Sequence, residues 1–120
     1  TIPEDADFTE TIFMHPTILF RYSAIGFVGH RIHYDYPYTK NEENYPDLIV
    51  HGPLQATFLL RAAEKLKGKT VTSFSHKVMA PVFANSDYII GAKENINGSV
   101  SCWGAVKGSG MTMQAEARFE

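Results

Sequence analysis

The chain has 120 residues, 44% of them hydrophobic and 20% charged, with a formal net charge of −2 at pH 7. This length predicts one globular domain with a modest core. The mixed charges exclude the basic footprint of a nucleic-acid-binding protein, and no apolar run approaches the ~20 residues that a membrane-spanning helix needs. The single cysteine, Cys102, excludes an internal disulfide framework and is compatible with a reducing compartment.

The N-terminal third of the chain is predicted to contain one strand. Residues 1–15 begin with TIPEDADF, which is acidic, and we expect a loosely attached extension without the order of a signal peptide. Residues 17–25 (TILFRYSAI) are rich in β-branched and aromatic side chains, which favours a strand. Gly26 and Gly29 are expected to turn the chain, Tyr36-Pro37-Tyr38 to break it, and residues 41–46 to lie on the surface.

One long helix is predicted from about Pro53 to Lys67. Its apolar residues recur at spacings of three, four and five and form one stripe: Leu54, Phe58, Leu59, Ala62, Ala63 and Leu66. Pro53 suits the first helical position, and Gly68 suits the C-terminal stop. A helix that begins here presents free backbone N–H groups and a partial positive charge, which stabilise a polar oxygen.

Four strands are predicted after the helix, at residues 70–80, 88–94, 99–107 and 111–119, with a strong hairpin-turn signal at Asn97-Gly98. In the last strand, one set of alternate residues is expected to be buried: Met111, Met113, Ala115, Ala117 and Phe119. The other set is expected to face water: Thr112, Gln114, Glu116 and Arg118. This order of elements predicts an α+β domain, a five- or six-stranded antiparallel sheet wrapped around one long helix. One helix cannot cover both faces of such a sheet, so we expect a second subunit.

Histidines mark the segment that is best suited to chemistry. Three of the five histidines, His30, His33 and His51, lie between Phe20 and Gly52. A histidine can transfer a proton near neutral pH, and the helix beginning at Gly52 could hold an oxyanion. Together these features suggest chemistry at a carbonyl group. A metal site is disfavoured, because zinc takes three or four ligands and the sequence offers only scattered candidates.

Two motifs carry a resemblance to a known family. FRYSAIGFVGHRIHYD (residues 20–35), then NYPDLIVHGPL (residues 44–54), a helix and four strands resemble the MaoC-like dehydratases and R-specific enoyl-thioester hydratases, which have the hot-dog fold. The pattern is most similar to the subgroup of mesaconyl-CoA hydratases and mitochondrial-type 3-hydroxyacyl-thioester dehydratases. The resemblance covers about Pro16 to Phe119 and implies reversible addition of water to a 2-enoyl thioester.

The resemblance also implies an acyl carrier, an oligomeric state and a location. The acyl carrier would be coenzyme A or acyl carrier protein, and no further cofactor is implied. Two folds would pair so that their sheets join, as a homodimer or a dimer of dimers, with no membrane or nucleic-acid partner. The implied location is the cytoplasm or, in a eukaryote, the mitochondrial matrix.

Residue by residue, the resemblance assigns three positions of the site. His33 matches the catalytic histidine, and Gly52 matches the glycine whose N–H binds the thioester oxygen. Val28 falls where the family has aspartate and the subgroup usually has asparagine, and its side chain can neither ionise nor accept a hydrogen bond. His30 is therefore the candidate for a second acid–base or water-orienting group. His51, beside the oxyanion site, is expected to steady the turn rather than to transfer protons.

The remaining candidates are interpreted more simply. Asp35 is expected to form a salt bridge with Arg31, and His76 to be structural. Cys102 beside Trp103 indicates a core position, and Lys77 is interpreted as a solvated surface residue rather than a phosphate ligand.

Two other functions remain open from the sequence. Because Val28 removes the usual acid, the chain could be a non-catalytic acyl-thioester-binding or structural subunit. A thioesterase would need a water near the thioester carbonyl, and no carboxylate at a suitable motif position favours that reaction.

Overall fold

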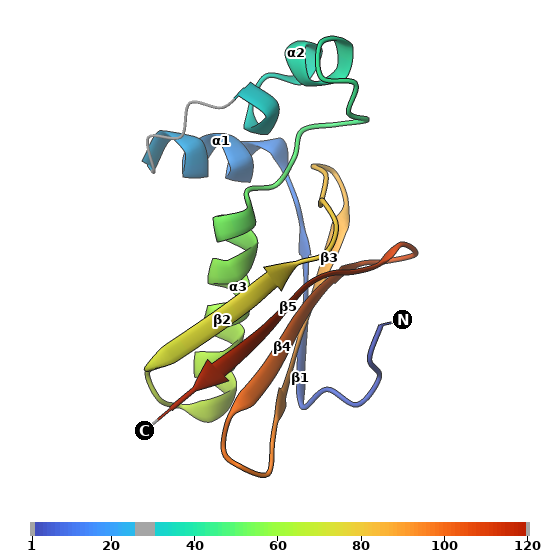
Figure 1. Ribbon diagram of the computed structural model, residues 1–120. Coiled ribbons are helices and arrows are strands. Elements are labelled where there is room, and N and C mark those ends of the chain that lie inside the picture. Colours follow the sequence, from blue (N-terminus) through green and yellow to red (C-terminus); the bar gives the residue numbers. More distant parts are fainter. Residues whose placement is uncertain (1, 26–30, 120) are drawn as a thin grey trace.

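The computed structural model describes residues 2–25 and 31–119 (Figure 1). In chain order its elements are β1 (Phe8–Phe13), α1 (Pro16–Ile25), the 3-10 turn η1 (Arg31–His33), α2 (Tyr36–Asn41), α3 (Gly52–Lys67), β2 (Ser73–Val78), β3 (Asp87–Glu94), β4 (Val100–Val106) and β5 (Gly110–Arg118). The five strands form one antiparallel sheet in the order β1-β3-β4-β5-β2. The predicted α+β architecture, an antiparallel sheet around one long helix, is confirmed, and it is the arrangement that a hot-dog fold requires.

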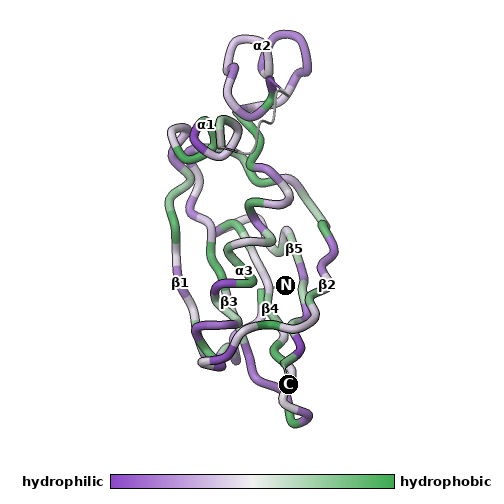
Figure 2. The backbone as a smooth tube through the Cα atoms, turned by 90° about the vertical axis from the view of Figure 1, so that its left-hand side faces the viewer, coloured by the Kyte–Doolittle hydropathy of each residue, from purple (hydrophilic) through white to green (hydrophobic). Residues whose placement is uncertain are grey.

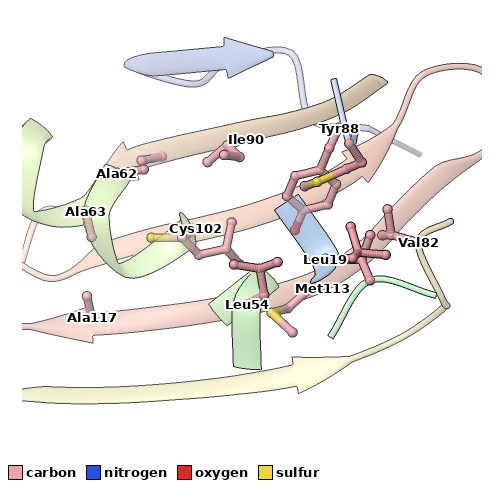
Figure 3. Packing of buried hydrophobic residues seen from close by; sticks show 14 of the residues in the cluster. Leu19, Leu54, Ala62, Ala63, Val82, Tyr88, Ile90, Cys102, Met113 and Ala117 are labelled. Atoms are coloured by element: carbon pink, nitrogen blue, oxygen red, sulfur yellow. The ribbon is translucent and has the colours of Figure 1, made fainter. Parts of the chain in front are cut away.

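Helix α3 fills the concave side of the sheet. Figure 3 shows Leu54, Ala62 and Ala63 of the helix facing Cys102 and Ala117 of the sheet. Small side chains on both surfaces allow helix and sheet to approach closely, and all five of these residues are buried. In Figure 2, β1 and β2 flank the helix, while α1 and α2 lie beyond its N-terminal end.

The limits of α3 agree with the sequence signals. The helix spans Gly52–Lys67, and Gly68 follows it in the left-handed conformation at φ 72°, where its N–H donates to the Glu64 carbonyl at 2.8 Å. Glycine enters that region without the steric cost that a β-carbon brings. The stop signal at Gly68 is therefore explained.

The strand predicted at residues 17–25 is wrong, because Pro16–Ile25 forms helix α1. Pro16 opens the helix, where its missing N–H costs nothing. Leu19 and Ser23 are buried and lie four residues apart, so they share the face that packs inward. Tertiary packing of this stripe overrides the β-propensity of its branched and aromatic side chains.

The N-terminal extension is also more ordered than predicted. Residues 8–13 form edge strand β1, paired antiparallel with β3 in the register Phe8↔Ala92 to Phe13↔Asp87. Phe8 and Ile12 pack against the core from one face of β1. Polar residues surround them in the sequence, so the alternation typical of a strand is hard to recognise there. Residues 36–38, expected to break the chain, instead begin α2, whose N-cap Asp35 accepts a hydrogen bond from the Tyr38 N–H at 3.1 Å.

Two residues of the last strand, Met111 and Thr112, face the opposite way from the prediction. Met111 was expected to be buried with Met113, but it pairs with Ala105 and borders the outer face of the sheet together with Gln114. Thr112 is buried, not wet, because the β4–β5 register shifts at Gly104/Ala105 and leaves Thr112 as the extra residue of a bulge. Its hydroxyl donates to Oε1 of Gln55 at 3.1 Å, and the Tyr88 hydroxyl donates to the same oxygen at 3.1 Å. This buried polar group ties the sheet to the first turn of α3.

Candidate active site

The segment from Leu48 to His51 places the start of α3. The Val50 N–H donates to the Val82 carbonyl at 2.7 Å, and the Ala84 N–H donates to the Leu48 carbonyl at 2.8 Å. The side chains of Leu48 and Val50 are buried. Apolar burial and two backbone bonds therefore fix where His51 ends and the helix begins.

His33 is anchored to this same segment. Its Nδ1 lies within hydrogen-bond distance of the Ile49 carbonyl oxygen, and the Ile49 N–H donates back to the Ile32 carbonyl at 2.8 Å. A carbonyl can only accept, so the hydrogen of the neutral ring is on Nδ1. This tautomer makes Nε2 the nitrogen that can take up a proton, which a general base requires.

His51 lies directly against His33. The two imidazole rings stack with centroids 3.8 Å apart and an interplanar angle of 18°. Nε2 of His51 lies 2.7 Å from the Ser23 hydroxyl, and the Tyr22 ring is tilted against the same imidazole at 4.6 Å between centroids. The structure thus gathers α1, η1 and the N-cap of α3 around one buried ring.

The surroundings of His51 make it a weak base. Burial, and secondly the neighbouring His33, lower the pKa of His51 from its ordinary 6.5 to about 4. Nδ1 of His51 finds no hydrogen-bond partner among the described residues. His51 is therefore neutral near neutral pH. That it steadies the turn rather than transfers protons stays a prediction.

Gly52 is the first residue of α3. Pro53 contributes no N–H and the first intrahelical bond runs from the Gln55 N–H to the His51 carbonyl, so the amides of Gly52 and Leu54 are the helix-terminal donors. A β-carbon at Gly52 would meet only Val78 Cγ2, at an ordinary 3.9 Å. Packing against the described residues does not require glycine here, which is consistent with a ligand approaching its backbone.

Arg31 and Asp35 form the predicted salt bridge. Nη2 of Arg31 lies 2.9 Å from Oδ2 of Asp35, and the guanidinium lies over the Tyr38 ring at 4.0 Å. The Tyr38 N–H and then Arg31 hold the pKa of Asp35 below its ordinary value. These contacts brace η1 against α2. His30 and Val28 lie outside the described residues, so their predicted roles stay predictions.

The other candidates lie away from the histidine pair. His76 and Lys77 are exposed on β2. Cys102 is buried, and burial raises the pKa of its thiol to about 12, so it is a core residue as predicted. Among residues 2–25 and 31–119, no group of three or more histidine, cysteine or acidic side chains could hold a metal ion.

Two hollows help to locate the site. A groove of about 510 Å³ on the outer face of the sheet includes Trp103, Met111 and Gln114, and none of the clustered histidines borders it. A smaller cavity of about 150 Å³ is bordered by Phe20, Ser23, Ala24 and Tyr34. Ser23, the partner of His51, is one of its walls, and the walls are mostly apolar, which suits an acyl group better than a charged one.

Two residues of the site escaped the sequence analysis. Ser23 and Tyr22 reach His51 only because residues 16–25 are helical, whereas a strand would place these neighbours on opposite faces. The available signal was Pro16 at a helix start, followed by Leu19 and Ser23 four residues apart.

Comparison with known proteins shows to which family the chain belongs. Residues 1–84 match the family described as Hydroxyacyl-thioester dehydratase type 2. The chain is 42% identical over 87 residues to the mesaconyl-C(4)-CoA hydratase of Chloroflexus aurantiacus, covering 72% of this chain and 31% of that protein. It is 35% identical over 85 residues to the mitochondrial hydroxyacyl-thioester dehydratase type 2 of Schizosaccharomyces pombe, covering 68% of this chain and 28% of that protein.

Both relatives are longer proteins, and the chain spans less than a third of either. Among solved structures, the (R)-hydratase from A. caviae involved in PHA biosynthesis matches with a TM-score of 0.80 at 15% identity, covering 96% of this chain and 94% of that one. At this identity the likeness concerns the fold alone, and it is an agreement over nearly the full length of both chains.

Proposed function

Because the chain belongs to the hydroxyacyl-thioester dehydratase type 2 family, we propose that it catalyses the reversible hydration of a 2-enoyl thioester to a 3-hydroxyacyl thioester. The observation that carries the proposal is the placement of His33. Its hydrogen is held on Nδ1 by the Ile49 carbonyl, and its ring stacks on the residue that caps α3. A proton acceptor and an oxyanion site are thus built from one short segment.

In the hydration direction, a water oxygen bonds to the β-carbon while Nε2 of His33 takes the water proton. Electrons of the double bond move toward the thioester, so negative charge develops on its oxygen. The amide of Gly52 and the positive end of α3 stabilise that charge. The α-carbon then receives a proton from a second group, for which His30 is the candidate from the sequence. Dehydration reverses these steps.

The carrier is coenzyme A or acyl carrier protein, since the names of the relatives specify a CoA ester in one case and a thioester in the other. We further propose that the working unit contains two hot-dog folds. Val78, which lies beside Gly52, is 53% exposed, and the next residue, Met79, is 48% exposed. A second fold would cover both side chains.

Crotonyl-CoA tests the reaction class. We expect a loss of the conjugated enoyl-thioester absorbance without release of free thiol. Thiol release would indicate a thioesterase. No change in either signal, together with saturable binding of the thioester, would favour the non-catalytic subunit to which Val28 points.

A further inference from the structure

The hairpin turn between β3 and β4 carries an asparagine–glycine pair that the proposed reaction does not use. Asn97 is exposed, and Gly98 follows it in the left-handed region at φ 87°. The Asn95 N–H donates to the Ser99 carbonyl at 2.8 Å, and the Gly98 N–H donates to the Asn95 carbonyl at 3.0 Å. Because glycine has no side chain, the peptide nitrogen after Asn97 is sterically open to the Asn97 amide.

Two hydrogen bonds fold the Asn97 side chain back over that peptide. Its Oδ1 accepts from the Ser99 N–H at 3.1 Å and from the Ser99 hydroxyl at 2.7 Å. A bond from an asparagine side chain to the N–H two residues further on closes a ring that contains the intervening peptide nitrogen, here that of Gly98. The turn therefore holds the amide carbon Cγ near the Gly98 nitrogen.

The Ser99 hydroxyl is itself oriented by the turn. Nδ2 of Asn95 donates to it at 3.0 Å and to the Ser101 hydroxyl at 2.9 Å. Since the Ser99 oxygen accepts from Asn95, its own hydrogen is directed to Asn97. The Asn97 carbonyl thus receives two hydrogen bonds, which stabilise negative charge that develops on its oxygen.

Cationic side chains beside the turn favour the same development of negative charge. Asn97 borders a hollow of about 320 Å³ together with Lys67, Lys69 and Arg118. Nζ of Lys67 lies 3.6 Å from the position that a β-carbon on Gly98 would occupy. The same Nζ pairs with Glu94 at 2.7 Å, so it is held in place beside the Gly98 peptide. A nearby cation favours the anionic form of its neighbour, here the peptide nitrogen after loss of its proton.

We propose that Asn97 is a site of self-modification, at which the turn converts asparagine to an aspartyl or isoaspartyl residue with water as the co-reactant. The Gly98 nitrogen is the nucleophile, Cγ of Asn97 is the electrophile, and Ser99 supplies the two donors that hold the oxyanion. The new carboxylate then lies at the rim of the cationic hollow, which stabilises the product.

The step balances without any other reagent. The hydrogen bond from Gly98 to Asn95 opens, the Gly98 nitrogen loses its proton, and a bond forms between that nitrogen and Cγ of Asn97. The Cγ–Nδ2 bond then breaks, and Nδ2 leaves as ammonia after taking up one proton. Water adds to either carbonyl of the resulting cyclic imide and opens it, which gives the ordinary or the β-linked carboxylate.

Asn85 provides an internal comparison, since it also adopts a left-handed conformation, at φ 63°. Its Nδ2 donates to a carboxylate, Oδ2 of Asp47, at 3.1 Å. The residue after it is serine, whose side chain crowds the peptide nitrogen, and the carboxylate disfavours negative charge at the amide. We expect Asn97 to react at least about tenfold faster than Asn85.

Peptide mapping by mass spectrometry follows both sites in the folded chain, incubated at neutral pH in water enriched in heavy oxygen. Heavy oxygen should enter at position 97, and fragmentation should find both linkages. Ser99→Ala removes the hydroxyl donor and should slow the reaction about threefold or more. Ser101→Ala is the matched control, because it removes a hydroxyl of the same hairpin that bonds Asn95, and it should leave the rate unchanged.

Two results would overturn the proposal. The first is an Asn97 that stays unmodified or reacts no faster than Asn85. The second is an equal rate in wild type and Ser99→Ala, with both folded by circular dichroism. If Ser99→Ala does not fold, Lys67→Gln removes the positive charge beside Gly98, and an undiminished rate in that variant contradicts the proposal equally. None of these measurements depends on turnover of a thioester.

Discussion

At the scale of the residue, Gly52 has no side chain, so substitutions there can test its backbone N–H as a hydrogen-bond donor. Gly52→Pro deletes the N–H at the first helical position, where proline is well tolerated. The preceding residue, His51, already has φ −59° and ψ 136°, which a residue before proline favours. We expect the variant to fold and to lose about 10²–10³ in kcat, or about 2.7–4 kcal/mol of transition-state stabilisation.

Gly52→Ala is the control for this experiment. It keeps the N–H, and its β-carbon meets only Val78, so any loss it shows measures crowding of the substrate. Steady-state hydration kinetics on both variants decide the matter. Full turnover by a folded Gly52→Pro protein would show that this amide does not hold the thioester oxygen.

The low pKa of His51 predicts how the free energy of unfolding depends on pH. Its pKa is about 4 in the folded chain and near 6.5 when exposed in the unfolded chain. Between these values the unfolded state binds more protons, so the free energy of unfolding falls as the pH falls from about 6.5 to about 4. Above 6.5 the group is neutral in both states and contributes no slope.

Urea denaturation at a series of pH values measures this slope. In Ser23→Ala/His51→Phe the dependence between pH 6.5 and 4 should flatten, because the titrating group is gone. An unchanged slope in the double variant would mean that His51 titrates normally in the folded protein.

The sequence singled out residues of the candidate site, but it did not reveal their contacts. His33, His51 and Gly52 could be named because their motif and the helix start are local features of the chain. The stack of His33 on His51 and the Ser23 bond join positions 18 and 28 residues apart, and the Ser23–His51 contact depends on α1 being helical. No local pattern reports such distances.

At the scale of the element, Tyr88 links the sheet to α3, and its side chain occupies the space that is left because Gly104 has no β-carbon. Its ring lies across Gly104 of β4, where a β-carbon would collide with the Tyr88 hydroxyl. That hydroxyl bonds Gln55 in the first turn of α3. Gly104→Ala should therefore lower the free energy of unfolding by about 1–3 kcal/mol through overpacking and loss of the hydrogen bond.

Chemical denaturation of Gly104→Ala checks this prediction, with Gly52→Ala as a glycine replacement that meets no close contact. Equal stability of Gly104→Ala and wild type would mean that Tyr88 can move aside without cost.

Elements were predictable where their pattern was periodic and capped. Helix α3 and the strands after it show strong stripes and turn signals, and the structure places them within a few residues of the prediction. Helix α1 and strand β1 were missed because their residues favour another conformation, and contacts with distant segments decide the outcome. The bulge at Thr112 depends on pairing with β4, which alternation within one strand cannot reveal.

At the scale of the whole molecule, β2 is an edge strand that needs a partner. Five of its six residues are exposed, and no described strand pairs with its outer side. We expect two copies to associate at this edge, since Val78 and Met79 are exposed and Val78 lies beside Gly52. Light scattering should give about twice the 13.4 kDa of one chain.

Val78→Asp/Met79→Asp should shift the protein toward the monomer. Ile96→Asp is the matched control, because Ile96 is equally apolar and fully exposed in the turn after β3. A 13.4 kDa wild-type protein at micromolar concentration would count against the paired assembly.

The central claim is that His33 accepts the proton of the water that adds to the enoyl thioester. The most direct test is the rate of crotonyl-CoA hydration by wild type and by His33→Ala, after circular dichroism has shown that both are folded. Removing a general base of this kind costs about 10²–10⁴-fold, so we predict a fall in turnover of at least about 100-fold. Hydration that proceeds equally fast in His33→Ala would contradict the account and place the chemistry elsewhere in the chain.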